Sequence, residues 1–309
     1  MKRYEECTNP FRNWDDWASV RTAPHRMLRS DEGGLLFPPE LAPMVRHPLI
    51  QREEAVANQL LTQHLHTYLW FTTKLEVQVV NAAVELLAFG ELGDLRIPDQ
   101  MRRDAFNILC DEAFHARCSA DMQHQVEEDT GMPAVLCEPQ FQQQLSALVL
   151  TLPEELRPLS RIGFAVVSET LISSKLACIP RDKRVAGAIR ALVAEHASDE
   201  ARHHAYFSHL FKVLWPQLPA PEQRELGMLL PRFITIFLEP DYGALTTMLR
   251  SVGLSAEQAG QVIAATYTPS AVVQDMHRAS KATVRLFRVT GVLDNADIAQ
   301  AFCEASLAE

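Results

Sequence analysis

The sequence has no stretch of about 18 apolar residues, the length that a membrane-spanning helix needs. Its first residues, MKRYEECTNPFRNW, lack the apolar core of a secretion signal. Basic residues are also few, with 29 Lys and Arg against 39 Asp and Glu and a formal net charge of −10. General nucleic-acid binders usually carry a basic excess. These absences predict a soluble cytoplasmic protein that binds neither membranes nor nucleic acid.

Paired cysteines and strand patterns are missing too. The six cysteines contain no Cys-x-x-Cys pair, which predicts reduced thiols rather than a disulfide framework. From residue 51 onward, apolar residues recur with the period of a helix, and convincing strand-like alternation is absent. With 309 residues, of which 47% are hydrophobic, the chain can bury one large core or two modest ones. The sequence therefore predicts an all-α fold.

Four long helices are expected in the middle of the chain, because segments such as GELGDLRIP and the residues around Gly131 and Pro133 separate long helical patterns. Shorter helices follow, and Ser255 with Gln258 has the spacing of a capping box. Residues 1–50 are expected to form an irregular N-terminal arm packed on the body, and residues 51–309 a single helical domain. The four long helices are predicted at about residues 51–89, 99–129, 153–179 and 185–215.

Two of these helices carry the same short motif. One reads DEAFHA and the other DEARHH, so each places a glutamate and a histidine three residues apart on one helical face. A single Glu-x-x-His is common by chance, whereas two on separate long helices are typical of ferritin-like di-metal bundles. The half-sites are Glu112 with His115 and Glu200 with His203. His196 shares the face of the second pair, because it precedes Glu200 by four residues.

Such a bundle takes one further glutamate from each of two other helices. Residues at equal height in an antiparallel helical pair are about equally far from its turn. Reflecting Glu200 through the turn at residues 179–184 leads to the region of Glu169, the one charged residue between Arg161 and Lys175. Burying an unpaired glutamate in such a run costs about several kcal/mol unless it is protonated or coordinated. Glu169 is therefore a strong candidate for a metal ligand.

The first helical pair offers two candidates. Glu76 shares its face with apolar residues, whereas Glu85 shares its face with more polar ones. The midpoint of Glu76 and Glu112 is residue 94, inside the GELGDL turn, so Glu76 is preferred. The predicted metal ligands are Glu76, Glu112, His115, Glu169, His196, Glu200 and His203.

The charge of this set suits a pair of metal ions. Four glutamates carry four negative charges, which two divalent cations would neutralise inside a helical core. Oxygen and imidazole donors without thiolate favour iron or manganese over structural zinc. The alternative is a helical protein whose carboxylates line up by chance.

Asp111 and Asp199 each stand directly before a glutamate of the two motifs. Ligand histidines usually donate their second ring N–H to a carboxylate. We therefore expect Asp199 to orient His115 and Asp111 to orient His203, each aspartate acting on the opposite half-site. Alternatively, both aspartates are solvated residues on the outside of their helices.

The pattern E…DEAFH…E…H-x-x-x-E-x-x-H resembles that of the p-aminobenzoate N-oxygenase family of non-haem diiron enzymes, loosely over residues 50–290. The histidine four residues before the last glutamate, here His196, is the distinctive element. The resemblance implies a ferritin-like four-helix bundle with additional C-terminal helices and two iron ions (Fe2+/Fe3+), with Glu112 and Glu200 bridging them. It also implies one iron on Glu76 and His115, and the other on Glu169, His196 and His203.

The resemblance further implies the reaction. Members oxidise a primary amine with O2 to a hydroxylamine, a nitroso or a nitro compound in natural-product biosynthesis. A homodimer and an external electron donor, either a protein or a reductant, follow from the same comparison. The sequence is compatible with aryl and aliphatic amines, free or carrier-bound.

Three other kinds of function remain open. A diiron hydroxylase or desaturase acting on C–H bonds would use similar ligands, although His196 counts mildly against it. An iron-binding or storage protein is disfavoured by the long C-terminal extension after the fourth helix. A radical-generating protein would need a tyrosine close to the iron, and Tyr206 follows His203 by three residues.

Overall fold

The computed structural model describes residues 9–29, 33–176 and 178–308, and within these ranges the protein is helical with no β-strand. One isolated parallel bridge joins Leu35 to Val185. The prediction of an all-α protein is therefore confirmed. None of the described helices combines the length and the apolar character that crossing a membrane requires. The five described cysteines are all free, and Cys7 lies outside the described residues.

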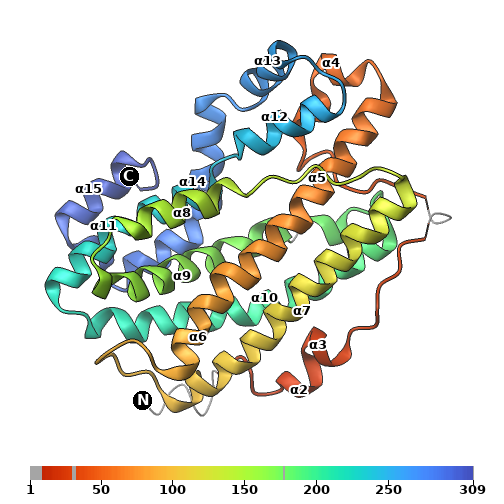
Figure 1. Ribbon diagram of the computed structural model, residues 1–309. Coiled ribbons are helices and arrows are strands. Elements are labelled where there is room, and N and C mark those ends of the chain that lie inside the picture. Colours follow the sequence, from red (N-terminus) through yellow and green to blue (C-terminus); the bar gives the residue numbers. More distant parts are fainter. Residues whose placement is uncertain (1–8, 30–32, 177, 309) are drawn as a thin grey trace.

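Four long helical rods form the centre of the molecule (Figure 1). The first rod packs along α7, α9 packs along α10, and α7 and α6 close the square against α10 and α9, respectively. One π-helical turn, η3, interrupts the first rod, and Glu76 is the first residue of this turn. The rods are α5 (Glu54–Leu75) with η3 (Glu76–Val80) and α6 (Asn81–Phe89), α7 (Asp99–Thr130), α9 (Arg157–Leu176) and α10 (Gly187–Leu214).

The predicted limits of the four rods agree with the structure to within a few residues. One further helix, α8 (Gln140–Leu150), was not predicted. It follows Pro139 and packs on α9 and α11, burying Phe141, Leu145 and Leu148. The stretch QFQQQLSALVL is short, but its buried residues have the spacing of a helical face, so the sequence did contain a signal for this helix.

Five helices follow the bundle. α11 and α14 cover α9, while α12 contacts α5. Gly163 of α9 allows a close approach, because a Cβ atom there would lie 2.9 Å from Leu226 Cδ1 of α11. The predicted capping box of Ser255 and Gln258 is present at the start of α13. These helices are α11 (Ala220–Leu238), α12 (Tyr242–Ser251), α13 (Ala256–Thr266), α14 (Pro269–Val289) and α15 (Ala296–Glu304).

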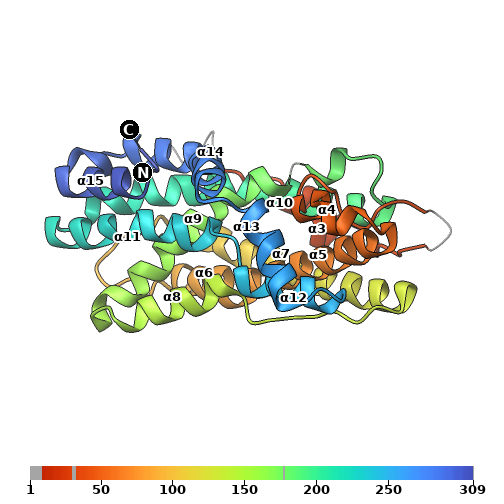
Figure 2. The same cartoon turned by 90° about the horizontal axis from the view of Figure 1, so that it is seen from above.

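The N-terminal segment contains short helices joined by irregular chain, α2 (Trp14–Trp17), α3 (Ser19–Thr22) and α4 (Pro48–Gln51). α3 contacts both α7 and α10, so the segment crosses the seam between these two rods. In Figure 2, α8, α11 and α15 lie toward one end of the elongated molecule, and α3 and α4 lie in its other half. The division of the chain at residue 50 stays a prediction.

His64 of α5 makes the stability of this end of the bundle depend on pH. Its side chain is 9% exposed, its ring stacks on Phe37, and its Nε2 atom has no hydrogen-bond partner among the described residues. Burial lowers the pKa of His64 from 6.5 to about 4. Between these values the unfolded chain binds the proton and the folded protein does not, so the stability that His64 contributes above pH 6.5 is lost as the pH falls.

We expect the metal-free protein to lose about 2 kcal/mol of unfolding free energy between pH 7 and pH 5 through His64 alone. Urea denaturation at both pH values measures the loss. A His64→Gln variant should show a correspondingly smaller loss. His124, which is 69% exposed, offers the matched control, and His124→Gln should keep the wild-type pH dependence. Equal pH dependence in His64→Gln and the wild type would contradict the prediction.

Candidate metal centre

The seven predicted ligands meet at one place inside the bundle, although they come from all four rods. Each is at most 6% exposed, and only His115 and His196 exceed 0%. Glu76 lies at the start of the π-helical turn, Glu169 on α9, and the other five on α7 and α10. The structure thus brings together every residue that the sequence analysis placed at the site.

The first group of donor atoms lies beside α5 and η3. His115, His196 and Glu200 each offer one ligand atom, and these atoms lie within 4.8 Å of one another. His196 Nε2 is 3.2 Å from Glu200 Oε1 and 3.4 Å from Glu76 Oε1. The rings of His115 and His196 are also adjacent, with centroids 4.2 Å apart. Glu76 therefore lies at the edge of this group.

The second group lies toward α9. Ligand atoms of Glu112, Glu169, Glu200 and His203 lie within 4.8 Å of one another, and all four residues are fully buried. His203 Nδ1 is 3.0 Å from Glu112 Oε1, 3.2 Å from Glu200 Oε1 and 3.8 Å from Glu169 Oε2. Glu200 belongs to both groups. The two groups are therefore neighbouring sites that share a carboxylate.

Glu112 also reaches both groups, with one oxygen turned toward each. Its Oε2 atom is 2.8 Å from His115 Nδ1, and its Oε1 atom is 3.0 Å from His203 Nδ1. The structure differs from the expected distribution of ligands in one respect. His196 lies with His115 and Glu76, whereas the resemblance had implied that it shares an ion with Glu169 and His203. The reason is that the side chain of His196 points from α10 toward the first rod and α7.

Both motif histidines turn the Nε2 atom of the ring toward an aspartate. His115 Nε2 is 3.0 Å from Asp199 Oδ2, and His203 Nε2 is 3.2 Å from Asp111 Oδ2. The Nδ1 atom of each ring faces the glutamates instead. These are the crosswise pairings that the sequence analysis expected. A carboxylate beside Nε2 favours the tautomer that carries its proton there, which leaves the Nδ1 lone pair for a metal ion.

The glutamate oxygens supply a test of whether metal ions fit this site. Both carboxylate oxygens of Glu169, Oε2 of Glu76 and Oε2 of Glu200 are buried and lack a hydrogen-bond partner among the described residues. Buried carboxylates without partners are costly unless they are protonated or coordinated. The donors are oxygen and imidazole nitrogen, which suit iron or manganese. The arrangement therefore fits a pair of divalent cations.

The pKa values of the carboxyl groups are shifted in opposite directions. Burial, reinforced by the charge of Glu112, raises the pKa of Glu76 to about 8. Burial and the charges of Glu200 and Glu112 raise the pKa of Glu169 well above its ordinary value. Although burial opposes it, the charge of His203 and a hydrogen bond to His196 hold the pKa of Glu200 well below its ordinary value.

The histidines hold the compensating protons. Burial lowers the pKa of His115, but its hydrogen bonds to Asp199 and Glu112 outweigh this effect and raise the pKa to about 10. Burial also opposes protonation of His203, yet the charges of Glu112 and Glu200 raise its pKa well above the usual range. The metal-free cluster thus holds protons that bound cations would displace.

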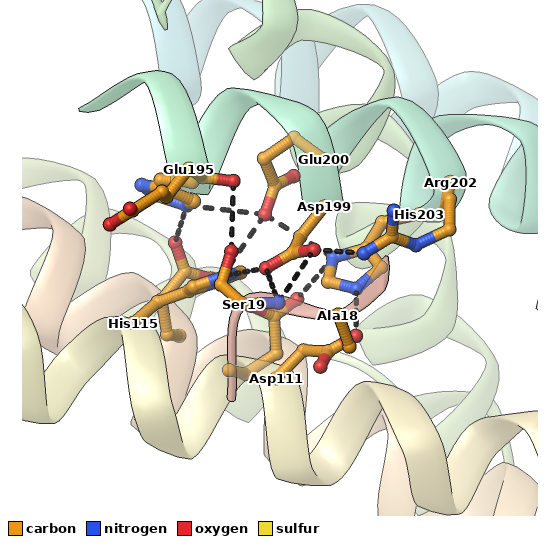
Figure 3. Close-up of polar contacts among 12 residues, drawn as sticks. Ala18, Ser19, Asp111, His115, Glu195, Asp199, Glu200, Arg202 and His203 are labelled. Atoms are coloured by element: carbon orange, nitrogen blue, oxygen red, sulfur yellow. Dashed lines mark hydrogen bonds and ion pairs between the residues drawn. The ribbon is translucent and has the colours of Figure 1, made fainter. Parts of the chain in front are cut away.

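Several residues that support this site were not found from the sequence. Trp14 and Ser19 of the N-terminal segment contact Asp111 and Asp199, and the guanidinium of Arg202 pairs with Asp199. Figure 3 shows contacts from Ser19, His115 and Arg202 converging on Asp199. Trp14 begins the four-residue helix α2, which lies far from the motifs in the sequence, so no spacing rule connected it with them.

Two cavities border the first rod, and predicted ligands line one of them. A small one of about 30 Å³, close to the size of one water molecule, is lined by His115, His196 and Tyr68. The Tyr68 hydroxyl is buried without a hydrogen-bond partner among the described residues. A larger cavity of about 540 Å³ lies between α5, α12, α14 and the chain around Cys137. Phe71 lines it and stands five residues before Glu76, about 7.5 Å along the helix axis and about 140° around it.

Replacing Asp199 by asparagine tests the crosswise pairing. We expect the Asp199→Asn variant to bind metal ions about 10- to 100-fold more weakly, because His115 loses the charged acceptor that fixes its tautomer. Titration with Fe2+ under anaerobic conditions measures the affinity. Asp129 is exposed at the end of α7, so Asp129→Asn is a matched control that should bind as the wild type does. Equal affinity in all three proteins would show that Asp199 does not orient a ligand.

Comparison with known proteins agrees with this geometry. The family model described as P-aminobenzoate N-oxygenase AurF matches residues 12–291. One relative, the 4-aminobenzoate N-oxygenase of Streptomyces thioluteus, is 24% identical over 280 residues, which cover 88% of this chain and 79% of the relative. The predicted family and the predicted class of oxygenase are thereby confirmed. The chain belongs to the p-aminobenzoate N-oxygenase family of oxygenase enzymes.

Proposed function

We propose that this protein is a diiron N-oxygenase that uses O2 to oxidise a primary amine to a hydroxylamine, and onward to a nitroso or nitro compound. The observation that carries the proposal is the pair of buried donor groups sharing Glu200, in a chain that belongs to this family. In the first step, one oxygen atom of O2 enters the N–H bond. The other leaves as water, with two electrons and two protons supplied from outside.

The seven side chains divide into two iron sites under this proposal. Glu76, His115 and His196 would hold one iron, Glu169 and His203 the other, and Glu112 and Glu200 would bridge both. When bound, the ferrous pair supplies electrons for the reduction of O2. The protein contributes the arrangement of the donors, because its aspartates orient the ligand histidines and its helices exclude bulk water from the buried carboxylates. An external donor, either a protein or a small reductant, restores the ferrous state.

The larger cavity supports a particular kind of amine. Its lining includes the aromatic rings of Phe71, Phe141 and Phe237, which suit an aromatic or apolar body. Acidic side chains outnumber basic ones in the lining, and Arg278, the one Lys or Arg among the described lining residues, pairs with Asp275. A free carboxylate on the substrate would therefore lack a cation of its own. We propose an amine that is uncharged away from its nitrogen.

Tyr206 bears on the radical-generating alternative. Its hydroxyl is buried and donates a hydrogen bond to the backbone carbonyl of Met101, at 2.9 Å. Met101 stands eleven residues before Glu112 on α7, which corresponds to about 16 Å along the helix axis. This hydroxyl therefore points away from the carboxylates, which favours an oxygenase over a protein that stores a tyrosyl radical.

Reconstitution of the purified protein tests the proposal. We expect two iron ions per chain, and we expect the ferrous protein with O2, a reductant and an aromatic amine to release a nitrogen-oxidised product detected by mass spectrometry. A product hydroxylated on carbon would favour the hydroxylase alternative, and iron uptake without a product would favour storage. The proposal extends to a cytoplasmic homodimer in natural-product biosynthesis, which family membership supports.

A further inference from the structure

We infer that the N-terminal segment is a working part of the metal centre, and that Trp14 and Ser19 are positioning residues that act on both half-sites through Asp111 and Asp199. The inference rests on the metal-binding part of the proposed function. Neither residue touches a predicted ligand in this role. Each holds an aspartate, and that aspartate in turn holds a ligand histidine on the opposite helix.

Trp14 supports the half-site on α10. Its indole Nε1 lies 2.9 Å from both carboxylate oxygens of Asp111, a residue that is fully buried. Asp111 Oδ2 is also the atom that faces His203 Nε2. An indole N–H is only a donor, so it fixes the plane of the carboxylate and leaves Asp111 to accept the proton of His203. The ring of Phe11 adds a stacked contact to His203, with centroids 6.0 Å apart.

Ser19 supports the half-site on α7. Its backbone N–H points at Asp199, with distances of 3.3 and 3.2 Å to the two carboxylate oxygens. The Ser19 hydroxyl donates to the backbone carbonyl of Glu195, which ties the same residue to α10. Asp199 Oδ2 accepts from His115 at 3.0 Å. Like the indole, a backbone amide can only donate, so it favours the same histidine tautomer on this side.

The two supports are linked, because Trp14 and Ser19 are only five residues apart along the chain. One turn of chain thus sets the orientation of a histidine on α7 and of a histidine on α10. Figure 3 shows Ala18 and Ser19 lying directly beside Asp199, between His115 and His203. The segment is therefore placed to fix the position of one half-site relative to the other.

Further contacts dock the segment independently of the two aspartates. Arg26 forms an ion pair with Glu195 on α10. Gln125 on α7 accepts from the backbone N–H of Leu28 at 2.7 Å and donates to the carbonyl of Arg26 at 2.9 Å. Removing the indole N–H should therefore leave the segment in place. This separation makes the positioning role testable without detaching the segment.

The first experiment compares Trp14→Phe with Trp17→Phe in the full-length chain. Trp17 lies on the same short helix and is 68% exposed, so it provides a matched control. Each metal-free protein is titrated with Co2+, and the visible absorption spectrum of the bound ion is recorded. We expect Trp14→Phe to bind Co2+ about tenfold more weakly, with a changed spectrum. Trp17→Phe should match the wild type in both respects.

A double variant distinguishes positioning from a general loss of stability. If Trp14 acts through Asp111, the Trp14→Phe/Asp111→Asn protein should bind Co2+ no more weakly than Asp111→Asn alone. If the fold-loss of Co2+ affinity in the double variant equals the product of the losses in the two single variants, the two residues act independently and the inference is overturned. Unchanged Co2+ affinity in Trp14→Phe would overturn it as well. Failure of the wild type to bind Co2+ would instead count against the proposed metal centre itself.

Ser19 provides a second test should Trp14→Phe fail to fold. Ser19 begins α3 and follows Ala18 in an extended conformation, so its backbone suits proline, whose Cδ would lie against Asp199 in place of the N–H. Ser19→Pro removes the amide donor, whereas Ser19→Ala removes only the hydroxyl. We expect about a tenfold loss of Co2+ affinity in Ser19→Pro and a much smaller loss in Ser19→Ala. Equal losses in the two variants would contradict a role for the amide.

Discussion

The Glu200→Gln variant is expected to lose both metal ions and to be inactive. Glu200 is the residue that belongs to both groups of donor atoms, so one substitution weakens both sites together. Its carboxylate also carries one of the charges that balance the cations, and an amide oxygen is a much weaker ligand. We expect fewer than one iron per chain, and amine oxidation slowed at least about 1,000-fold, which corresponds to about 4 kcal/mol of barrier.

The metal-free form of this variant should also be less stable than the metal-free wild type. The pKa of Glu200 is held well below its ordinary value, despite burial, by the charge of His203 and by hydrogen bonding to His196. Glu200 therefore stays ionised and offsets the buried charge of His203, whose Nδ1 is 3.2 Å away. Removing one partner of a buried ion pair costs about 3–5 kcal/mol. Thermal unfolding of the chelated proteins measures this loss.

Glu85 supplies the matched control for this experiment. It is exposed on α6 and was the competing candidate in the first rod, so Glu85→Gln makes the same chemical change outside the cluster. That variant should keep its iron content, activity and stability. If the Glu200→Gln protein retained two irons, the shared carboxylate would not be required for iron binding.

The seven residues of the cluster could be predicted from the sequence because helical hairpins have a simple geometry. Glu169 is isolated in an apolar run, and it is the charged residue closest to the position that reflecting Glu200 through the turn indicates. The order Asp-Glu in both motifs likewise indicated the crosswise partners of His115 and His203. These inferences needed only the period of the helix and the position of each turn.

Other features depend on how the rods rotate against one another, which the helical period does not determine. The spacing places His196 on the ligand face of α10, but the rotation of that helix turns its ring toward His115. The π-helical turn that begins at Glu76 has no sequence signature of its own. Trp14 and Ser19 reach their partners across 97 and 180 residues of chain, respectively, from a segment with no periodic pattern.

Replacing Glu169 by methionine should make the metal-free protein more stable, whereas Glu200→Gln should make it less stable. Glu169 is fully buried, both of its oxygens lack a hydrogen-bond partner among the described residues, and burial with the charges of Glu200 and Glu112 raises its pKa well above its ordinary value. Methionine has a similar length and no polar group to bury. We therefore expect Glu169→Met to stabilise the metal-free protein by about 1–3 kcal/mol.

The same substitution should destabilise the iron-loaded protein relative to the loaded wild type, because one iron loses a ligand that no neighbour replaces. We expect about one iron per chain instead of two, and activity reduced at least about 100-fold, equivalent to about 2.7 kcal/mol of barrier. Unfolding midpoints with and without Fe2+ reveal the change of sign. Glu85→Met, at an exposed site, should shift neither midpoint appreciably. A Glu169→Met protein destabilised equally with and without iron would show that Glu169 serves packing alone, because only a ligand gains its stabilising value from the bound ion.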